Sequence, residues 1–158
     1  MLLEVGNVFV TLSENVVDIF CRFRQVNDAQ AEAGGIVLGQ VSTDERRIFV
    51  NRASTPSRYD RRWPFGFQRN RHWAQQIVEY EYYNSGGRNT YLGEWHTHPA
   101  DRAIPSYRDY KMIADQFSRN DIQVRWLLLL IIARSELFIG LQTETGLTAY
   151  TNCQYSCQ

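Results

Sequence analysis

The segment at residues 90–109 reads TYLGEWHTHPADRAIPSYRD, and it says more about the fold than any other part of the chain. Residues 90–98 are rich in β-branched and aromatic side chains, which predicts a strand that ends in two histidines. Ser106 then precedes apolar residues at helical spacing through about Phe117, which predicts a helix with Asp109 in its first turn. The order of strand, loop and helix therefore brings two histidines and an aspartate to neighbouring ends.

The rest of the chain alternates between expected strands and helices. Strands are predicted at residues 8–12, 36–39, 47–50, 124–133, 136–142 and 147–151, and helices from residue 13 to about 26 and from 71 to about 83. Residues 36–50 are expected to form a hairpin, and residues 53–70 a long irregular connection, a length that is usually functional or mobile. Because the apolar run at residues 127–132 needs cover on both faces, we predict an α/β fold with a mixed sheet flanked by helices.

Composition limits the possible functions. The 158 residues suit one domain spanning residues 1–158, and 44% hydrophobic with 22% charged residues is typical of a folded protein. The 17 basic residues balance the 17 acidic ones, so neither a nucleic acid nor a membrane partner is expected. The longest apolar run, residues 126–133, is far shorter than the roughly 20 residues of a membrane helix.

Three cysteines bear on the cellular compartment. Cys21, Cys153 and Cys157 are an odd set, and the chain starts without a basic segment followed by a cleavable apolar stretch. We therefore expect a cytoplasmic protein with reduced thiols. Cys21 falls on a predicted apolar helix and is expected to be a buried thiol. Cys153 and Cys157 have no further ligands nearby, which favours an exposed or redox-inactive pair over a metal site.

His96, His98 and Asp109 are candidate metal ligands. On a strand, residues two apart point to the same face about 6.6 Å apart, so two imidazoles can converge on one ion. Two histidines and one aspartate suit catalytic zinc, because three protein ligands leave a fourth position for water. Each residue also has a simpler explanation, since Ser106 and Asp109 match a helix capping box and a lone strand histidine is usually hydrogen-bonded. The histidine pair together with the spaced aspartate favours the metal site.

The pattern His-x-His-Pro at residues 96–99 and Ser-x-x-Asp at residues 106–109, with seven residues between His98 and Ser106, resembles the signature of the JAMM metalloproteases, also called MPN+ or JAB. Glu32 stands before a glycine-flanked predicted strand, where that family has its catalytic glutamate. The resemblance implies the family's α/β/α fold, which is like that of cytidine deaminases, and one zinc ion per chain.

The resemblance also implies a mechanism. Zinc would lower the pKa of its bound water towards about 7, and Glu32 would take the proton. The Ser106 hydroxyl would help to stabilise the oxyanion, and Glu32 would pass the proton to a departing lysine amine. Cys21 is then not needed as a nucleophile, because no covalent acyl-enzyme forms.

The segment at residues 93–99 is similar to the stand-alone peptidases of CBASS anti-phage operons, in which a cyclic-oligonucleotide synthase is conjugated through its C-terminus to a lysine. This resemblance implies a protein substrate, namely the C-terminal tail of a conjugated protein or of a ubiquitin-like modifier. It also implies partners among the ubiquitin-like activating and conjugating enzymes of the same operon. Trp63, Phe65 and Phe67 are candidates for binding the tail as an added strand, although a solvated, partly core-anchored loop explains them equally well.

Two other classes of protein compete with the peptidase. Non-catalytic MPN-type scaffolds have lost the metal ligands, and this chain retains them. A zinc nucleobase deaminase needs a His-x-Glu motif and a later Pro-Cys-x-x-Cys motif, and the sequence has neither. Eukaryotic relatives that select one ubiquitin linkage carry a second zinc, but no histidine follows Asp109, so that specificity is not expected.

Overall fold

The computed structural model describes residues 1–157, which form ten strands and three helices. The strands are β1 (Leu2–Val5), β2 (Val8–Leu12), β3 (Gly34–Val41), β4 (Arg47–Ala53), β5 (Arg61–Trp63), β6 (Gly66–Gln68), β7 (Thr90–Thr97), β8 (Leu127–Ile132), β9 (Glu136–Thr143) and β10 (Gly146–Gln154). The helices are α1 (Glu14–Phe23), α2 (Arg71–Asn84) and α3 (Tyr107–Arg119). Within residues 1–157, no helix has the length and apolar character needed to cross a membrane.

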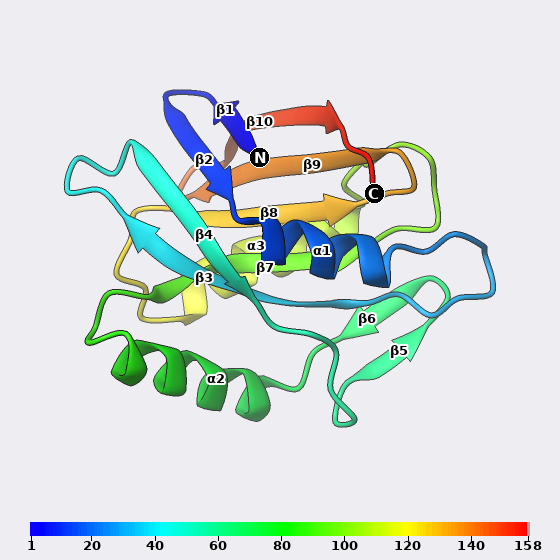
Figure 1. Ribbon diagram of the computed structural model, residues 1–158, viewed down its shortest axis with the longest axis horizontal. Helices are drawn as coiled ribbons and strands as arrows, with labels where there is room; N and C mark the ends of the chain where they lie inside the picture. The colour runs from blue at the N-terminus through cyan, green and yellow to red at the C-terminus, as the bar shows by residue number, and fades with distance from the viewer. Residues whose placement is uncertain (158) are drawn as a thin grey trace.

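Eight strands form one mixed sheet in the order β1-β2-β4-β3-β7-β8-β9-β10, and β5 pairs with β6 in a separate hairpin (Figure 1). The β2–β4 and β7–β8 pairs are parallel, and the other neighbours are antiparallel. The central strand β8 is buried on both faces. Its even-numbered residues pack with Val16 and Phe20 of α1, and its odd-numbered residues pack with Ile113 of α3. The α/β architecture and the two-sided cover of β8 confirm the predictions.

The large sheet curls so that its two outer strands approach each other. β1 and β10 lie at opposite ends of the strand order, yet they lie beside each other in space (Figure 1). A Cβ added to Gly6, just after β1, would lie 2.9 Å from the Cβ of Ala149 in β10. The curvature encloses apolar residues of β1, β2 and β4 in the same core that α1 covers.

A bulge in β7 sets the direction of the side chains that follow it. The register between β3 and β7 shifts next to Gly93, which has a φ of 151°. A Cβ at Gly93 would collide with the carbonyl oxygen of Leu128, so only glycine fits there. Because of the bulge, Tyr91 before it and Glu94 after it lie on the same face of the sheet, and the Tyr91 hydroxyl donates to Glu94 at 2.6 Å. His96, two residues beyond Glu94, points to the same face as Glu94.

Most of the predicted elements are present, and the hairpin expected at residues 36–50 is the antiparallel β3–β4 pair. Three details differ. The strand β1 was not predicted, and the connection at residues 53–70 contains the short β5–β6 hairpin instead of being irregular throughout. The helix α1 ends at Phe23, and Val26, which was expected to extend its apolar face, is 59% exposed.

The expectation of three reduced thiols is wrong for this structure. Cys21 of α1 and Cys157 form a disulfide across a sequence separation of 136. Cys21 is therefore not a free buried thiol, and Cys157 does not form a pair with Cys153, which is a free cysteine. The disulfide holds the C-terminal segment against α1.

Candidate metal centre

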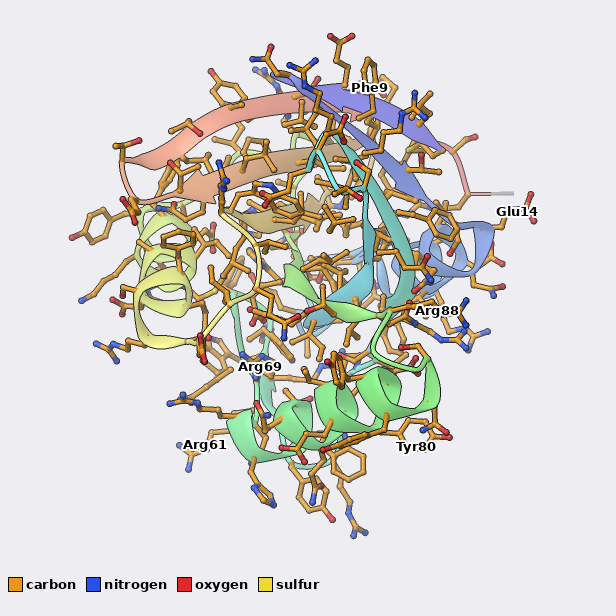
Figure 2. All side chains as sticks on the ribbon, turned by 90° about the vertical axis from the view of Figure 1, so that its left-hand side faces the viewer. Phe9, Glu14, Arg61, Arg69, Tyr80 and Arg88 are labelled. Atoms are coloured by element: carbon orange, nitrogen blue, oxygen red, sulfur yellow. A yellow bond between two sulfur atoms is a disulfide. The ribbon has the colours of Figure 1, made fainter. Side chains whose placement is uncertain are left out.

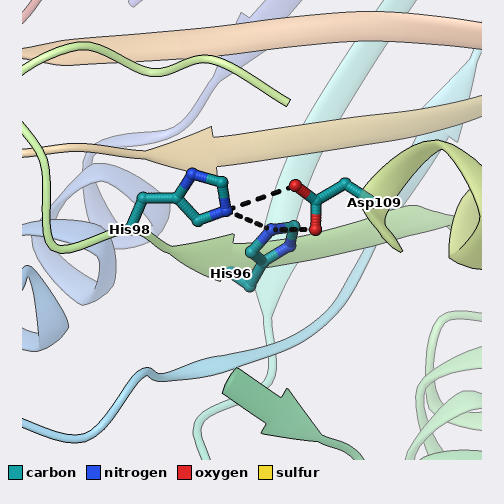
Figure 3. Close-up of side chains that lie close together, drawn as sticks. All are labelled: His96, His98 and Asp109. Atoms are coloured by element: carbon teal, nitrogen blue, oxygen red, sulfur yellow. Dashed lines mark hydrogen bonds and ion pairs between the residues drawn. The ribbon is translucent and has the colours of Figure 1, made fainter. Parts of the chain in front are cut away.

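Three side chains meet where β7 ends and α3 begins. The Nε2 atom of His96 lies 3.1 Å from Nε2 of His98 and 3.0 Å from Oδ1 of Asp109. The Nε2 atom of His98 lies 3.3 Å from Oδ2 of Asp109. Figure 3 shows the three groups pointing toward one another. The structure thus brings together the residues whose spacing predicted a metal site, and we call them the His-His-Asp triad.

The donor atoms of the triad are consistent with a bound metal ion. Zinc holds nitrogen and oxygen ligands at about 2.0–2.2 Å, and tetrahedral angles then place the donor atoms about 3.3 Å apart. The observed separations of 3.0, 3.1 and 3.3 Å are close to that value. Burial alone would raise the pKa of Asp109, but hydrogen bonds with His96 and His98 outweigh it and hold the pKa well below its usual range. Asp109 is therefore ionised at neutral pH, as a metal ligand must be.

Ser106 caps α3 and also faces the cavity. Its hydroxyl oxygen accepts a hydrogen bond from the Asp109 N–H at 3.3 Å, and its own N–H donates to Asp109 Oδ2 at 2.6 Å. The capping-box explanation of these two residues is therefore correct. It does not exclude a second role, because capping occupies an acceptor position and leaves the hydroxyl hydrogen free to be donated.

Glu32 lies just before β3 and shares one cavity with Ser106 and the triad. The cavity has a volume of about 430 Å³. Burial of the carboxyl group raises the pKa of Glu32 to about 7, and the charge of Asp109 adds to the rise, whereas His98 and Arg108 oppose it. A carboxyl group with a pKa near neutrality suits a general base at physiological pH.

A buried polar network fixes the segment before β3 against the end of β7. The side chain of Gln25 is fully buried, and its amide donates to the carbonyl oxygens of Gln30 at 2.7 Å and Pro64 at 3.0 Å. The Thr97 hydroxyl donates to the side-chain oxygen of Gln25 at 2.9 Å and accepts from the Ala33 N–H at 3.0 Å. Gln25 was not predicted from the sequence, because its partner on β7 is 72 residues away and no motif marks the position.

The aromatic residues predicted to bind substrate lie on the β5–β6 hairpin. Trp63, Phe65 and Phe67 line the same cavity as the triad. The hairpin is attached to the Glu32 segment, since the Glu32 N–H donates to the carbonyl oxygen of Trp63 at 2.9 Å and the Arg62 side chain donates to the carbonyl oxygen of Glu32 at 2.7 Å. Trp63 is 43% exposed and Phe65 is 67% exposed, so neither ring belongs to the core.

A buried ion pair forms another part of the cavity wall. The Arg69 guanidinium donates to both carboxylate oxygens of Glu94, at 3.0 and 2.7 Å. Burial opposes the charge of Arg69, but the Glu94 carboxylate outweighs it and raises the pKa of Arg69. This pair was not predicted from the sequence. The position of Glu94, two residues before His96 on the same strand, is the signal that could have identified it.

The mixed sheet, with the His-His-Asp triad between a strand end and a helix start, defines an α/β protein with a candidate metal centre. The chain belongs to the family described as prokaryotic homologs of the JAB domain, whose model matches residues 14–146. A Vibrio cholerae protein named CD-NTase/cGAS isopeptidase is 31% identical over 150 residues, covering 93% of this chain and 90% of the relative. A Pseudomonas aeruginosa protein of the same name is 31% identical over 134 residues, covering 85% and 83%.

A solved structure supports the assignment of the fold. The solution structure of a protein from Desulfitobacterium hafniense superposes with a TM-score of 0.60 over 94% of this chain and 92% of that chain. Its sequence identity is 22%, so the likeness concerns the fold alone.

Proposed function

We propose that this protein is a zinc-dependent isopeptidase of the JAMM type. Its substrate would be the bond after the C-terminus of a ubiquitin-like modifier or of a conjugated CD-NTase, and its role would be to reverse such conjugation in a bacterial anti-phage system. The observation that carries the proposal is that the His-His-Asp triad and Glu32 line one cavity. The family match and the two isopeptidase relatives support the reaction class and the substrate.

Each residue of the site would have a distinct chemical role. His96, His98 and Asp109 would hold zinc, which when bound supplies Lewis-acid chemistry that activates water near neutral pH and polarises a carbonyl group. Glu32 takes a proton from the attacking water, because its pKa of about 7 suits a base at that pH. The same carboxyl group then gives the proton to the departing lysine amine. The Ser106 hydroxyl donates a hydrogen bond to the carbonyl oxygen as negative charge develops on it.

The hairpin would bind the tail that precedes the cleaved bond. Trp63, Phe65 and Phe67 present aromatic surface beside the triad. Within residues 1–157, β6 pairs with no strand other than β5, so an extended peptide can add at its outer edge. The partners that would supply the conjugate are ubiquitin-like activating and conjugating enzymes.

A non-catalytic scaffold of the MPN type is the second candidate. Such a protein needs neither a cavity around the triad nor a buried base. Burial of Glu32 disfavours its charged form, a cost that serves catalysis but not assembly. The arrangement of Glu32 therefore favours the enzyme.

The different roles of Glu32 as general base and His98 as metal ligand can be tested directly. We expect Glu32→Ala to keep its zinc but to lose at least about 100-fold in cleavage rate, since it removes the general base. His98→Ala should lose both zinc and cleavage, because it removes a donor atom. Glu144→Ala, at an exposed carboxylate outside the cavity, is the matched control and should cleave normally. Cleavage at the wild-type rate by Glu32→Ala would contradict the mechanism.

A further inference from the structure

A groove continues from the metal centre along α3. The cavity around the triad and a neighbouring cavity of about 440 Å³ share the lining residues Arg71, Arg108, Met112 and Gln116. The neighbouring cavity extends along α3 as far as Asn120, just beyond the end of the helix. The two cavities are therefore adjacent, and we refer to them together as the groove.

The wall of this groove beyond the triad is positively charged. Arg71, Arg108, Lys111 and Arg119 line the second cavity, and Asp115 is the carboxylate among its lining residues. Arg119 approaches Asp115 at 3.9 Å in a pair that is largely exposed, so the ion pair is weak. The whole chain carries no net charge, so the excess of cations is a local feature.

The other charges near the groove do not neutralise these cations. Arg69, which lies near the start of α2 in Figure 2, is balanced by Glu94. Asp109 belongs to the triad, and Glu32 lines the cavity around the triad but not the neighbouring one. The Arg71 guanidinium donates to the uncharged side chain of Asn120 at 3.3 Å and so keeps its full charge.

Two of the cations lie at helix positions that the helix dipole disfavours for a positive charge. Arg71 and Arg108 lie in the first turns of α2 and α3, where the helix dipole favours acidic side chains. The first turn of α2 has no acidic residue, and Asp109 in the first turn of α3 is itself part of the triad. A local preference that is broken beside a site is typical of binding residues.

We propose that the groove binds an acidic segment of the protein that carries the acceptor lysine. This inference rests on the proposed isopeptidase function and adds a preference on the lysine side of the bond. The aromatic hairpin lines only the cavity around the triad, whereas Lys111 and Arg119 line only the neighbouring cavity along α3. A substrate whose C-terminal tail lies against the hairpin therefore places its lysine side along α3, where acidic residues meet the cations and speed association.

Three isopeptide-linked peptides serve as probes. All have the C-terminal segment of a CD-NTase as their tail, and they differ only in the residues that flank the acceptor lysine, which are acidic, neutral or basic. With the zinc-loaded full chain at low ionic strength, we expect kcat/KM to be at least about tenfold higher for the acidic probe than for the basic one, mainly through KM. High salt should reduce the difference, because it screens exposed charges.

A charge reversal away from the metal ligands makes the test specific. The double variant Lys111→Glu with Arg119→Glu should retain its zinc, cleave the neutral probe and favour the basic probe over the acidic one. The matched control is Arg46→Glu with Arg47→Glu, which makes the same change in net charge on exposed residues at the start of β4, outside the groove. The control should keep the wild-type preference.

The outcomes separate this inference from the proposed function. Equal cleavage of the three probes by the wild type, or an unchanged preference in the groove variant, would overturn the acidic-segment assignment and leave the isopeptidase intact. If the zinc-loaded wild type cleaves none of the probes, the proposed function fails and the inference fails with it.

Discussion

Glu32 makes the stability of the metal-free protein depend on pH. Burial is the main reason that its pKa is raised from 4.5 to about 7 in the folded state. Between these two values the folded state binds more protons than the unfolded state, so the free energy of unfolding falls as pH rises through this range. Below pH 4.5 the penalty is absent, and above pH 7 it is present in full.

Replacing this carboxyl group by a neutral amide should remove the pH-dependent penalty. In chelator-treated protein, we expect Glu32→Gln to raise the free energy of unfolding at pH 8 by about 1–2 kcal/mol after allowance for solvent screening, and to change it little at pH 4. Urea unfolding at the two pH values measures the effect, with the exposed Glu144→Gln as control. An equal effect of Glu32→Gln at both pH values would show that Glu32 is not protonated by burial.

At the scale of residues, spacing in the sequence was sufficient for the triad but not for its surroundings. His96 and His98 are two apart on a strand, and Asp109 follows in the first turn of the next helix, so local geometry brings them together. Gln25 and Arg69 could not be predicted in the same way. Their partners lie on β7, and only the folded sheet brings those segments together.

The β5–β6 hairpin adds an aromatic wall to the cavity around the triad, which a metal site alone would lack. Its backbone is joined to Glu32, and its Phe67 ring lies over Gly34, where an added Cβ would collide with the ring. The hairpin therefore forms one unit with the start of β3, so that aromatic side chains and the base are placed together.

Truncating the aromatic side chains of this hairpin should weaken substrate binding more than catalysis. We expect Trp63→Ser with Phe67→Ser to raise KM by roughly tenfold or more, with zinc content unchanged. The variant lacks the contact area that the two large rings provide to the bound substrate. Tyr80→Ser is the control, since Tyr80 is 65% exposed on α2, away from the start of that helix (Figure 2). Steady-state kinetics with a conjugate substrate would distinguish this role from a structural one, in which KM stays at the wild-type value.

At the scale of elements, long periodic segments were predictable and short ones were not. The apolar pattern of α1 and the continuous apolar run of β8 identified both elements. β5 and β6 have three residues each, too few to show a period of two. β1 has four residues, and the Gly6-Asn7 turn that follows it was the available signal.

The disulfide joins Cys157 to Cys21 of the first helix, two residues that are far apart in the sequence. Its closure spans 136 positions in the sequence, so it restricts the unfolded chain strongly. Cys157→Ser should therefore lower the free energy of unfolding by about 2–4 kcal/mol in non-reducing buffer and should match the wild type in excess reductant. Cys153→Ser, at the free cysteine, is the control. Three reactive thiols in the unfolded non-reduced wild type would contradict the pairing.

At the scale of the whole molecule, the fold class was predictable but the closure of the sheet was not. Alternating strands and helices with a run that is buried on both faces were sufficient for a mixed sheet. The approach of β1 to β10, and the pairing of Cys21 with Cys157, depend on contacts between the two ends of the chain. Cysteine spacing alone cannot select a pairing.

The central claim is that the His-His-Asp triad holds a metal on which cleavage of an isopeptide bond depends. The most direct test measures metal content by mass spectrometry for the purified wild type and for His96→Ala, beside a conjugate-cleavage assay with and without chelator. We expect one zinc per wild-type chain and chelator-sensitive cleavage, with both lost in His96→Ala. A metal-replete wild type that holds no metal and cleaves no conjugate would contradict the claim and favour the scaffold.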